Sequence, residues 1–357
     1  MNKLNLALIG QGRSGRDIHG AYLKRAENEY FTVKYVVDAD EGRRIRAEEE
    51  YPGCRAFANY RELFACDDID IVVNSTYSDC HYPITKDLLA HGFNVLCEKP
   101  FCRTRAEANE LIALAKEKGL LLAIFQQTFF APFYTMAKEL IASGKLGRIT
   151  QIDIRYNGFS RRWDWQTLQR RCAGGTYNTG PHPIGMALGF LDFDPEAKLV
   201  YSYLDTVLTS GDGDDCAKLL LTAPGKPLVD VEIHANDPYT PYNLKIMGTK
   251  GCYLSDAGSK WKMTYIVDGE NPEQPVIDGF LQKADGTPTY CSEKLIKHEE
   301  EGTHAGSAFN IGTATLYKNL YGALQGTEEL IITPEMARDI IGIAEDAYRA
   351  TPLPIKY

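Results

Sequence analysis

The first third of the chain alternates short, continuous apolar runs with segments of helical periodicity. In the segments at 13–26 and 103–118, apolar residues recur every three to four positions among charged ones, which predicts amphipathic helices. The apolar runs are LNLALIG (4–10), FTVKYVVD (31–38), IDIVVNST (69–76), FNVLCEK (93–99) and LLLAIFQ (120–126). Strands that are buried on both faces and separated by helices are typical of a doubly wound parallel sheet. We therefore expect an α/β domain over residues 1–125.

The pattern changes after Pro132. A helical segment at 133–147 is followed by stretches in which apolar and polar residues alternate, and this period of two predicts a sheet with one face solvated or paired. The alternating stretches include RITQIDIRYNGFS (148–160), KLLLTA (218–223), PLVDVEIHAND (227–237) and YNLKIMG (242–248). We expect a second, α+β domain over residues 126–357.

Composition narrows the classes of protein. The chain has 357 residues, of which 44% are hydrophobic, and this is enough for two cores. The formal net charge is −9 and basic residues are spread along the chain, so we expect no nucleic-acid partner. The N-terminal apolar run is too short for a signal sequence or a membrane span, which predicts a cytoplasmic protein with no membrane partner. The nine cysteines form no CxxC pair or zinc spacing, so we expect reduced thiols and no metal site.

The motif GQGRSG follows the first predicted strand and opens the first predicted helix. Gly10 permits a tight turn, Gly12 lets a pyrophosphate approach the backbone, and Gly15 allows close packing of the helix. Arg13 and Ser14 lie in the same loop, where amides at the start of the helix can receive the phosphate charge. In this context the motif predicts a dinucleotide-binding Rossmann fold, with all five residues at the cofactor.

An acid at the end of the second predicted strand supports this prediction. Asp38 lies 23 residues after Gly15, where a carboxylate can accept hydrogen bonds from the adenosine ribose hydroxyls. The same carboxylate would repel a 2′-phosphate, so we expect NAD rather than NADP. Arg43 and Arg44 follow closely, and they leave the strictness of that preference open.

Four further motifs follow in a fixed order. They are TYSDCH (76–81), EKP (98–100), IMGTKGCYLSD (246–256) and FNIGTATLYKNLYGALQG (309–326). With the glycine motif and Asp38, they resemble the Gfo/Idh/MocA oxidoreductases over nearly the whole chain. The resemblance implies a C-terminal domain built on a large, mostly antiparallel open sheet, which assembles homodimers or homotetramers. It also leaves room for the C-terminal helix to pack back on the first domain.

The EKP motif lies at the carboxyl edge of the predicted parallel sheet, where Rossmann folds bind their ligands. The ammonium of Lys99 could there stabilise an alkoxide as a hydride departs, although many lysines at strand ends are only solvated. Glu98 could hydrogen-bond the nicotinamide ribose. Pro100 would fix the backbone that aims both side chains.

In the resembling family, the segment that corresponds to TYSDCH lines the nicotinamide half of the site. Thr76 and His81 match the family pattern, whereas Tyr77 and Ser78 stand where the family has proline and asparagine. We expect Thr76 on the cofactor side. His81 either contacts the cofactor or caps and packs the helix that it opens.

The stretch NTGPHP (178–183) holds a histidine between two prolines. Histidine titrates nearest neutral pH, so an imidazole fixed beside Lys99 could accept the hydroxyl proton during hydride transfer. The family's D-x-G-x-H motif matches at Gly180 and His182, with Asn178 in place of the aspartate. An amide can position a group but cannot accept its proton. We therefore expect His182 as the proton acceptor, Lys99 as the stabiliser and Asn178 as a positioning residue, one helical turn from His182 if the segment opens a helix.

Two further positions depart from the family pattern. Phe129 stands where many relatives carry an arginine, so that arginine's contact to substrate or cofactor is missing here. Gly185 stands where they carry an acid, three residues after the histidine. Gln127 occupies a position where asparagine is common, and we expect it at the cofactor.

The segment at 159–185 also holds Trp163 and Trp165 with an acid between them. Such a pair could stack on a sugar ring and hydrogen-bond its hydroxyls, or it could anchor the loop to the core. The four arginines of this segment could pair with an anionic substrate or form solvated ion pairs.

These residues together predict an NAD-dependent dehydrogenase that acts on a secondary hydroxyl of a sugar, glycoside or cyclic polyol such as an inositol. Two alternatives stay open. In the first, NAD is recycled in place, and a transient keto-sugar allows glycoside cleavage or elimination. In the second, the protein is a non-catalytic NAD-bound sensor, which the replaced aspartate invites but the retention of Lys99 and His182 opposes.

Overall fold

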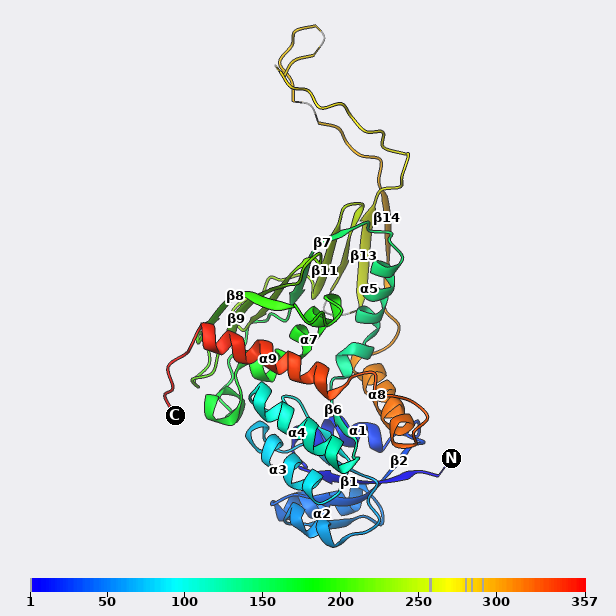
Figure 1. Ribbon diagram of the computed structural model, residues 1–357, viewed down its shortest axis with the longest axis vertical. Coiled ribbons are helices and arrows are strands. Elements are labelled where there is room, and N and C mark those ends of the chain that lie inside the picture. Colours follow the sequence, from blue (N-terminus) through cyan, green and yellow to red (C-terminus); the bar gives the residue numbers. More distant parts are fainter. Residues whose placement is uncertain (1, 257–258, 280, 284, 291) are drawn as a thin grey trace.

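The computed structural model describes residues 2–256, 259–279, 281–283, 285–290 and 292–357. The chain forms two regions, each organised around one β-sheet (Figure 1). The N-terminal region carries a parallel sheet and the second region a larger, mostly antiparallel one, so the predicted fold class is confirmed.

The first sheet has the strand order β3-β2-β1-β4-β5-β6, and its pairs are all parallel. Its strands are β1 (Leu4–Ile9), β2 (Phe31–Val37), β3 (Arg55–Phe57), β4 (Ile71–Asn74), β5 (Val95–Cys97) and β6 (Leu122–Ile124). The strand order reverses between β1 and β4, and this switch point is where doubly wound sheets bind their ligands. The five predicted strands are present, and the short edge strand β3 was missed because three half-exposed residues give no apolar run.

The helices of this region begin and end at recognisable signals. They are η1 (Arg13–His19), α1 (Gly20–Leu23), α2 (Glu41–Glu50), η2 (Tyr60–Ala65), α3 (Ser78–Ala90) and α4 (Arg105–Lys118). The side chain of Thr104 caps α4 at one end, and Gly119 ends it with a φ of 65°. The helix expected over 13–26 instead starts as a wide π-helical turn, η1, and ends at Leu23.

The second sheet has the order β14-β13-β12-β11-β7-β10-β9-β8, in which only the described pair β7–β10 is parallel. Its strands are β7 (Ile149–Arg155), β8 (Lys198–Asp205), β9 (Cys216–Thr222), β10 (Leu228–His234), β11 (Leu244–Gly248), β12 (Gly251–Ser255), β13 (Lys260–Tyr265) and β14 (His298–Thr303). Val229, Val231 and Ile233 are buried on the face that carries the helices. Alternate residues lie on the other face, where Arg155 pairs with Asp230. The predicted alternation is therefore confirmed.

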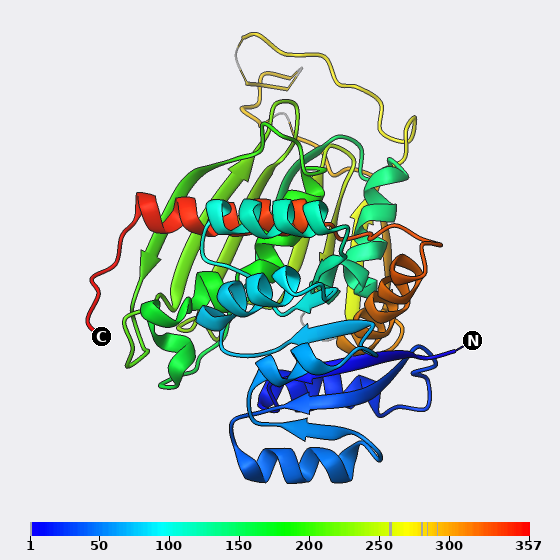
Figure 2. The same ribbon diagram turned by 60° about the horizontal axis from the view of Figure 1, so that its bottom comes forward.

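Helices lie against one face of the second sheet (Figure 2). They are η3 (Gln127–Phe130), α5 (Pro132–Ala142), η4 (Trp165–Thr167), η5 (Gln169–Arg171), α6 (Gly175–Asn178), α7 (Pro181–Phe190), α8 (Ala308–Leu324) and α9 (Pro334–Ala350). Helix α7 is buried on nearly all sides and packs against β10, whereas α9 lies between α4 and α7. The site residues carried by α6 and α7, Asn178 and His182, are half-buried on this support.

The C-terminal part of the chain returns to the first region. Leu316, Tyr317 and Leu320 of α8 share one apolar cluster with Leu6 and Phe31 of the first sheet. The core of the N-terminal region is therefore completed by a helix that follows the second sheet in the sequence.

The described residues between β13 and β14 (266–279, 281–283, 285–290 and 292–297) extend away from the sheet as an arm (Figure 1). Eight cysteines are free thiols, and Cys291 lies outside the described residues. No helix of the described chain is long and apolar enough to cross a membrane.

Candidate active site

The carboxyl ends of β1, β4, β5 and β6 bring the sequence motifs to one edge of the first sheet. Gly10 follows β1, Thr76 follows β4, and Glu98 and Lys99 follow β5. Lys99 Nζ donates a hydrogen bond of 2.7 Å to the backbone oxygen of Asn178, which joins this edge to the second region. The predicted catalytic residues therefore meet at the predicted edge.

The glycine loop is packed where glycine is required and open where a ligand is expected. Gly10 has a φ of +90°. A Cβ on Gly15 would lie 1.8 Å from the Gly10 oxygen, whereas a Cβ on Gly12 would meet only Arg43 Nη1, at 3.8 Å. The loop thus leaves space at Gly12 for a pyrophosphate. Arg13 is exposed and Ser14 half-buried beside this space, and Arg13 makes no ion pair with any described residue.

Asp38 is fixed at the end of β2 by backbone amides. Its Oδ2 accepts from the Gln11 amide at 2.7 Å, and its Oδ1 accepts from the Asp40 amide at 2.9 Å. Arg43 Nη1 lies 3.5 Å from Oδ2. The carboxylate therefore adjoins the glycine loop, as ribose binding requires, and carries a cation beside it.

Glu98 is 4% exposed, and each of its oxygens lies close to a polar nitrogen. Its Oε2 accepts from the Lys99 amide at 3.0 Å, and its Oε1 lies 3.2 Å from His19 Nε2. Burial acts to raise the pKa of this carboxyl, but His19, Lys99 and His81 outweigh it, so the pKa lies below its usual value. Glu98 is therefore ionised inside the protein.

Lys99 is partly buried and close to other cations. Burial lowers the pKa of its ammonium below the usual value; Glu98 opposes this change, and Arg13 and Arg162 add to it. The site therefore holds a cation that is easier to deprotonate than a lysine in water.

His182 presents a neutral imidazole. Its Nδ1 lies 2.6 Å from Thr128 Oγ1, and its ring stacks on Tyr156 with centroids 6.5 Å apart. Burial, and then the charge of Lys99, lower the pKa of His182 to about 3. Its Nε2 has no hydrogen-bond partner among the residues described, so this nitrogen can face a substrate.

The link between Asn178 and His182 differs from the expected helical turn. Asn178 ends α6 and His182 lies in α7, which begins at Pro181. The two helices are separate because Pro181 and Pro183 have no amide hydrogen to continue the bonding pattern. The expectation that both lie on one helix was therefore wrong. The side chain of Asn178 accepts from Gln166 Nε2 at 2.8 Å, while its backbone oxygen holds Lys99.

The two remaining departures from the family pattern, Phe129 and Gly185, are in contact with each other. A Cβ on Gly185 would come within 3.1 Å of Phe129 Cε2. Phe129 is buried and packs edge-on against Tyr134. An apolar contact therefore occupies the place of the arginine and the acid.

The side chain of His81 is buried and contacts the loop that follows β5. It is 2% exposed, with Nδ1 2.6 Å from the Pro100 oxygen and Nε2 3.2 Å from the Thr76 oxygen. Burial lowers the pKa of His81. These contacts support the packing alternative over direct contact with the cofactor. Gln127 is also buried, and its Oε1 has no partner in the described part of the chain.

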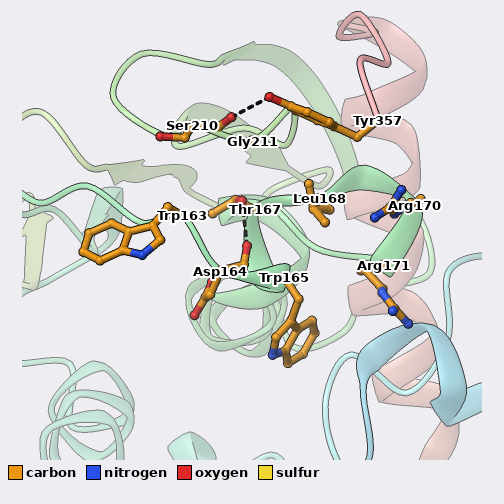
Figure 3. A pocket seen from close by; sticks show the side chains of 10 residues that line it. All are labelled: Trp163, Asp164, Trp165, Thr167, Leu168, Arg170, Arg171, Ser210, Gly211 and Tyr357. Carbon is orange, nitrogen blue, oxygen red and sulfur yellow. Dashed lines mark hydrogen bonds between the residues drawn. The ribbon is translucent and has the colours of Figure 1, made fainter.

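Trp163 and Trp165 line a surface pocket of about 400 Å³ together with Ser210 and Tyr357 (Figure 3). Neither Lys99, Asn178 nor His182 lines this pocket. Trp163 is 78% exposed, and Trp165 packs edge-on against Tyr77, 4.9 Å away, so Trp165 lies nearer to the cofactor edge. Substrate binding by the tryptophans stays a prediction.

Two of the four arginines in this segment form ion pairs. Arg162 pairs with Asp164 at 2.6 Å, and Arg171 pairs with Asp79 at 2.9 Å. These two arginines follow the ion-pair alternative, and pairing of an anionic substrate with Arg161 or Arg170 stays a prediction.

The motif GDGDD (211–215) was not among the predicted site motifs, and its acids hold the segment that leads to Asn178 and His182. Asp212 accepts from the Gln169 amide at 2.9 Å, and Asp214 accepts from the Thr176 amide and hydroxyl at 2.8 Å. The sequence signal was the presence of two glycines among three acids, which is typical of a tight loop whose carboxylates accept hydrogen bonds from backbone amides. His19 was also missed, because nothing in its sequence context predicts a contact with Glu98.

Two family models match the chain. The first, described as an oxidoreductase family with an NAD-binding Rossmann fold, matches residues 4–126. The second, described as the GFO/IDH/MocA C-terminal domain, matches residues 134–254. Together they cover most of the chain, and the first confirms the predicted NAD-binding fold.

Similar proteins have related names. An uncharacterized oxidoreductase of Schizosaccharomyces pombe, C26H5.09c, is 27% identical over 77% of this chain and 76% of its own length. The scyllo-inositol 2-dehydrogenase (NADP(+)) IolW of Bacillus subtilis is 26% identical, but the match spans about half of each chain, 53% and 52%. The 2,7-anhydro-N-acetylneuraminate hydratase of Mediterraneibacter gnavus is 24% identical over 97% of this chain and 94% of its own.

The fold is also that of solved structures. GenD2 from gentamicin A biosynthesis, solved in complex with NAD, superposes with a TM-score of 0.74 at 20% identity, and the match covers 98% of this chain and 94% of that one. At this identity the likeness supports the fold.

The geometry at Asp38 predicts the effect of Asp38→Asn on cofactor choice. The amide keeps an oxygen for the Gln11 amide but loses the charge that repels a 2′-phosphate, so Arg43 would face NADP unopposed. We expect NAD to bind about tenfold more weakly and NADP more tightly, as calorimetric titration with each dinucleotide would measure. Arg43→Ala is the matched control, which should weaken NADP only. Wild-type protein that already binds NADP more tightly than NAD would contradict the assignment of Asp38.

Proposed function

The chain belongs to the Gfo/Idh/MocA family of oxidoreductases, and from that premise we propose that it moves a hydride between NAD and a secondary hydroxyl or ketone carbon of a sugar, glycoside or cyclic polyol. The observation that supports this most is the meeting of Lys99 and His182 at the carboxyl edge of the first sheet. A partly buried ammonium beside a neutral imidazole suits the oxidation of an alcohol, which must lose both a proton and a hydride.

The residues present fit a dinucleotide. The open space at Gly12 and the free cation of Arg13 suit the pyrophosphate, and Asp38 suits the adenosine ribose. Glu98, as an ionised carboxylate, suits the nicotinamide side. When bound, NAD accepts or returns the hydride.

Lys99 and His182 have different roles at the substrate hydroxyl. Lys99 brings a positive charge to a partly buried site, where it stabilises the alkoxide that forms as the hydroxyl proton leaves. If His182 Nδ1–H donates to Thr128 Oγ1, then Nε2 keeps a lone pair and accepts that proton. The hydroxyl proton thus ends on Nε2, and Thr128 fixes the tautomer.

Asn178 positions these groups in two ways. Its backbone oxygen holds the ammonium of Lys99, and this contact is the same whether the side chain is an amide or a carboxylate. Its side chain is held by Gln166, whose Nε2 donates to Oδ1. The replacement of the family's aspartate therefore removes a charge from the site without removing the contact that holds Lys99.

The substrate class rests on the family and on the names of relatives. One similar protein is named an inositol dehydrogenase, and we propose a cyclic, hydroxyl-rich substrate for this chain as well. The cytoplasmic location and the assembly as a homodimer or homotetramer stay predictions.

A second candidate is redox-neutral chemistry, in which the hydride is returned to the same substrate molecule. It is favoured by the similarity to a protein named a hydratase over 97% of this chain, because hydration involves no net oxidation. The same Lys99 and His182 would then act twice, first on the hydroxyl and afterwards on the ketone.

A panel of free sugars, glycosides and inositols separates these candidates. Each compound is incubated with the purified protein and NAD, while NADH absorbance and the products are followed. We expect net NADH with at least one secondary alcohol, because the site can remove both a proton and a hydride. A product formed without net NADH would select the redox-neutral candidate. Neither product nor NADH, in a protein that binds NAD, would contradict the proposed activity.

The role of His182 predicts a kinetic result with any compound that the panel identifies. His182→Ala should lower kcat by about 10²–10⁴-fold and leave NAD affinity nearly unchanged, because the imidazole acts on the hydroxyl. His234→Ala is the control, since His234 lies on the opposite face of the second sheet and should leave kcat unchanged.

The pH profile of the wild type tests the division of roles. With the pKa of His182 near 3, the imidazole is already neutral at mildly acid pH, and kcat/KM for oxidation should show no acid limb near pH 6.5. A limb at higher pH that disappears in Lys99→Met would assign the base to Lys99 instead.

A further inference from the structure

His19 is a fully buried histidine that sits directly behind the EKP motif. It ends η1, is 0% exposed, and packs against Phe125 with ring centroids 4.5 Å apart. Its Nε2 lies 3.2 Å from Glu98 Oε1, and its Nδ1 lies 2.8 Å from the hydroxyl of Tyr317. A residue of the glycine-motif helix therefore connects α8 with the carboxylate beside Lys99.

The hydrogen-bonding groups fix the tautomer of this imidazole. The hydroxyl of Tyr317 has no other partner among the described residues, so it donates to His19 Nδ1. Nε2 then carries the hydrogen and points to Glu98, which as a carboxylate can only accept. Nε2 and Oε1 lie 3.2 Å apart in a close polar contact, and neither atom has a hydrogen-bond partner in the described chain. Each of these two atoms therefore faces the other, with no competing partner among the described residues.

We propose that His19 is a positioning residue, which holds Glu98 as a fixed, ionised carboxylate at the nicotinamide side of the site, with Tyr317 setting its tautomer. The inference deepens the proposed function, because it assigns a residue outside the matched motifs to the cofactor half of the same site. It concerns the binding of NAD, so it does not depend on which substrate is oxidised.

The charge of Glu98 depends on the groups that face it. These are His19 from η1, His81 from α3, Tyr317 from α8, and Cys97 and Lys99 on its own strand and loop. Burial favours the protonated form, and His19 is the first among the groups that oppose it. Without His19, Glu98 would take up a proton at a higher pH than in the wild type.

Loss of that charge has a specific consequence for the cofactor. The oxidised nicotinamide ring is a cation, whereas the reduced ring is neutral. An ionised carboxylate on this side stabilises the oxidised form more than the reduced form. The affinity for NAD should therefore fall with pH once His19 is removed, and the affinity for NADH should change less.

The experiment measures the dissociation constants of NAD and NADH by calorimetry at pH 8.5 and pH 6. His19→Leu removes the donor and keeps an apolar side chain, while His19→Gln restores an N–H near the position of Nε2. We expect NAD binding by His19→Leu to weaken about tenfold more between pH 8.5 and pH 6 than that of the wild type. In His19→Gln, the affinity for NAD should change between pH 8.5 and pH 6 by no more than it does in the wild type.

A second pair of variants guards against a folding defect in His19→Leu. Tyr317→Phe removes only the hydroxyl that fixes the tautomer, and Tyr22→Phe removes a hydroxyl from the ring that stacks on Tyr317 at 4.6 Å. At pH 6, we expect Tyr317→Phe to lose less NAD affinity than His19→Leu does. We expect Tyr22→Phe to lose none.

Two results would overturn the inference. The first is an equal loss of NAD affinity at both pH values in His19→Leu and His19→Gln, which would make His19 a packing residue. The second is an unchanged affinity in both His19→Leu and Tyr317→Phe. Failure of the protein to oxidise any sugar would contradict the proposed function without changing these binding results.

Discussion

The site depends on one electrostatic constraint, which is a lysine placed in a partly buried site beside a histidine. Burial alone would favour the neutral amine, but Glu98 lies next to Lys99 and opposes that change. The same ammonium makes protonation of His182 costly, so the pair shares a single positive charge. The protein thereby supplies a stabiliser for an alkoxide and an uncharged proton acceptor at the same edge.

The rest of the fold holds this arrangement through backbone contacts and distant segments. The carbonyl of Asn178 receives the ammonium, and the GDGDD loop fastens the segment that leads to it. Helix α8 completes the core of the first region and brings Tyr317 to His19. Catalytic geometry at one strand end therefore relies on residues that are up to 298 positions apart in the sequence.

The sequence predicted the elements and motifs that rest on local patterns. Buried strands followed by glycines, and the period-2 strands after Pro132, give direct signals of the two sheets, and the carboxyl ends of parallel strands necessarily meet at one edge. It failed where a contact joins distant segments, as for His19 with Glu98. It placed Asn178 one helical turn from His182 on the condition that the segment opens a helix, and two separate helices carry these residues because two prolines lack amide hydrogens. Phe129 and Gly185, which replace the family's arginine and acid, pack against each other. Their contact is visible only in the structure, because the two positions are far apart in the sequence.

The most direct test of this account is the protonation state of His182 in solution. Nitrogen-15 spectra of histidine-labelled protein, compared with those of His182→Gln to assign the signal, report both the charge and the tautomer of the ring. The account predicts a neutral imidazole with the hydrogen on Nδ1 and no titration between pH 8 and pH 5, because burial and Lys99 lower the pKa to about 3. A midpoint near 6.5, or a hydrogen on Nε2, would contradict it, since the nitrogen that faces the substrate could not then accept a proton.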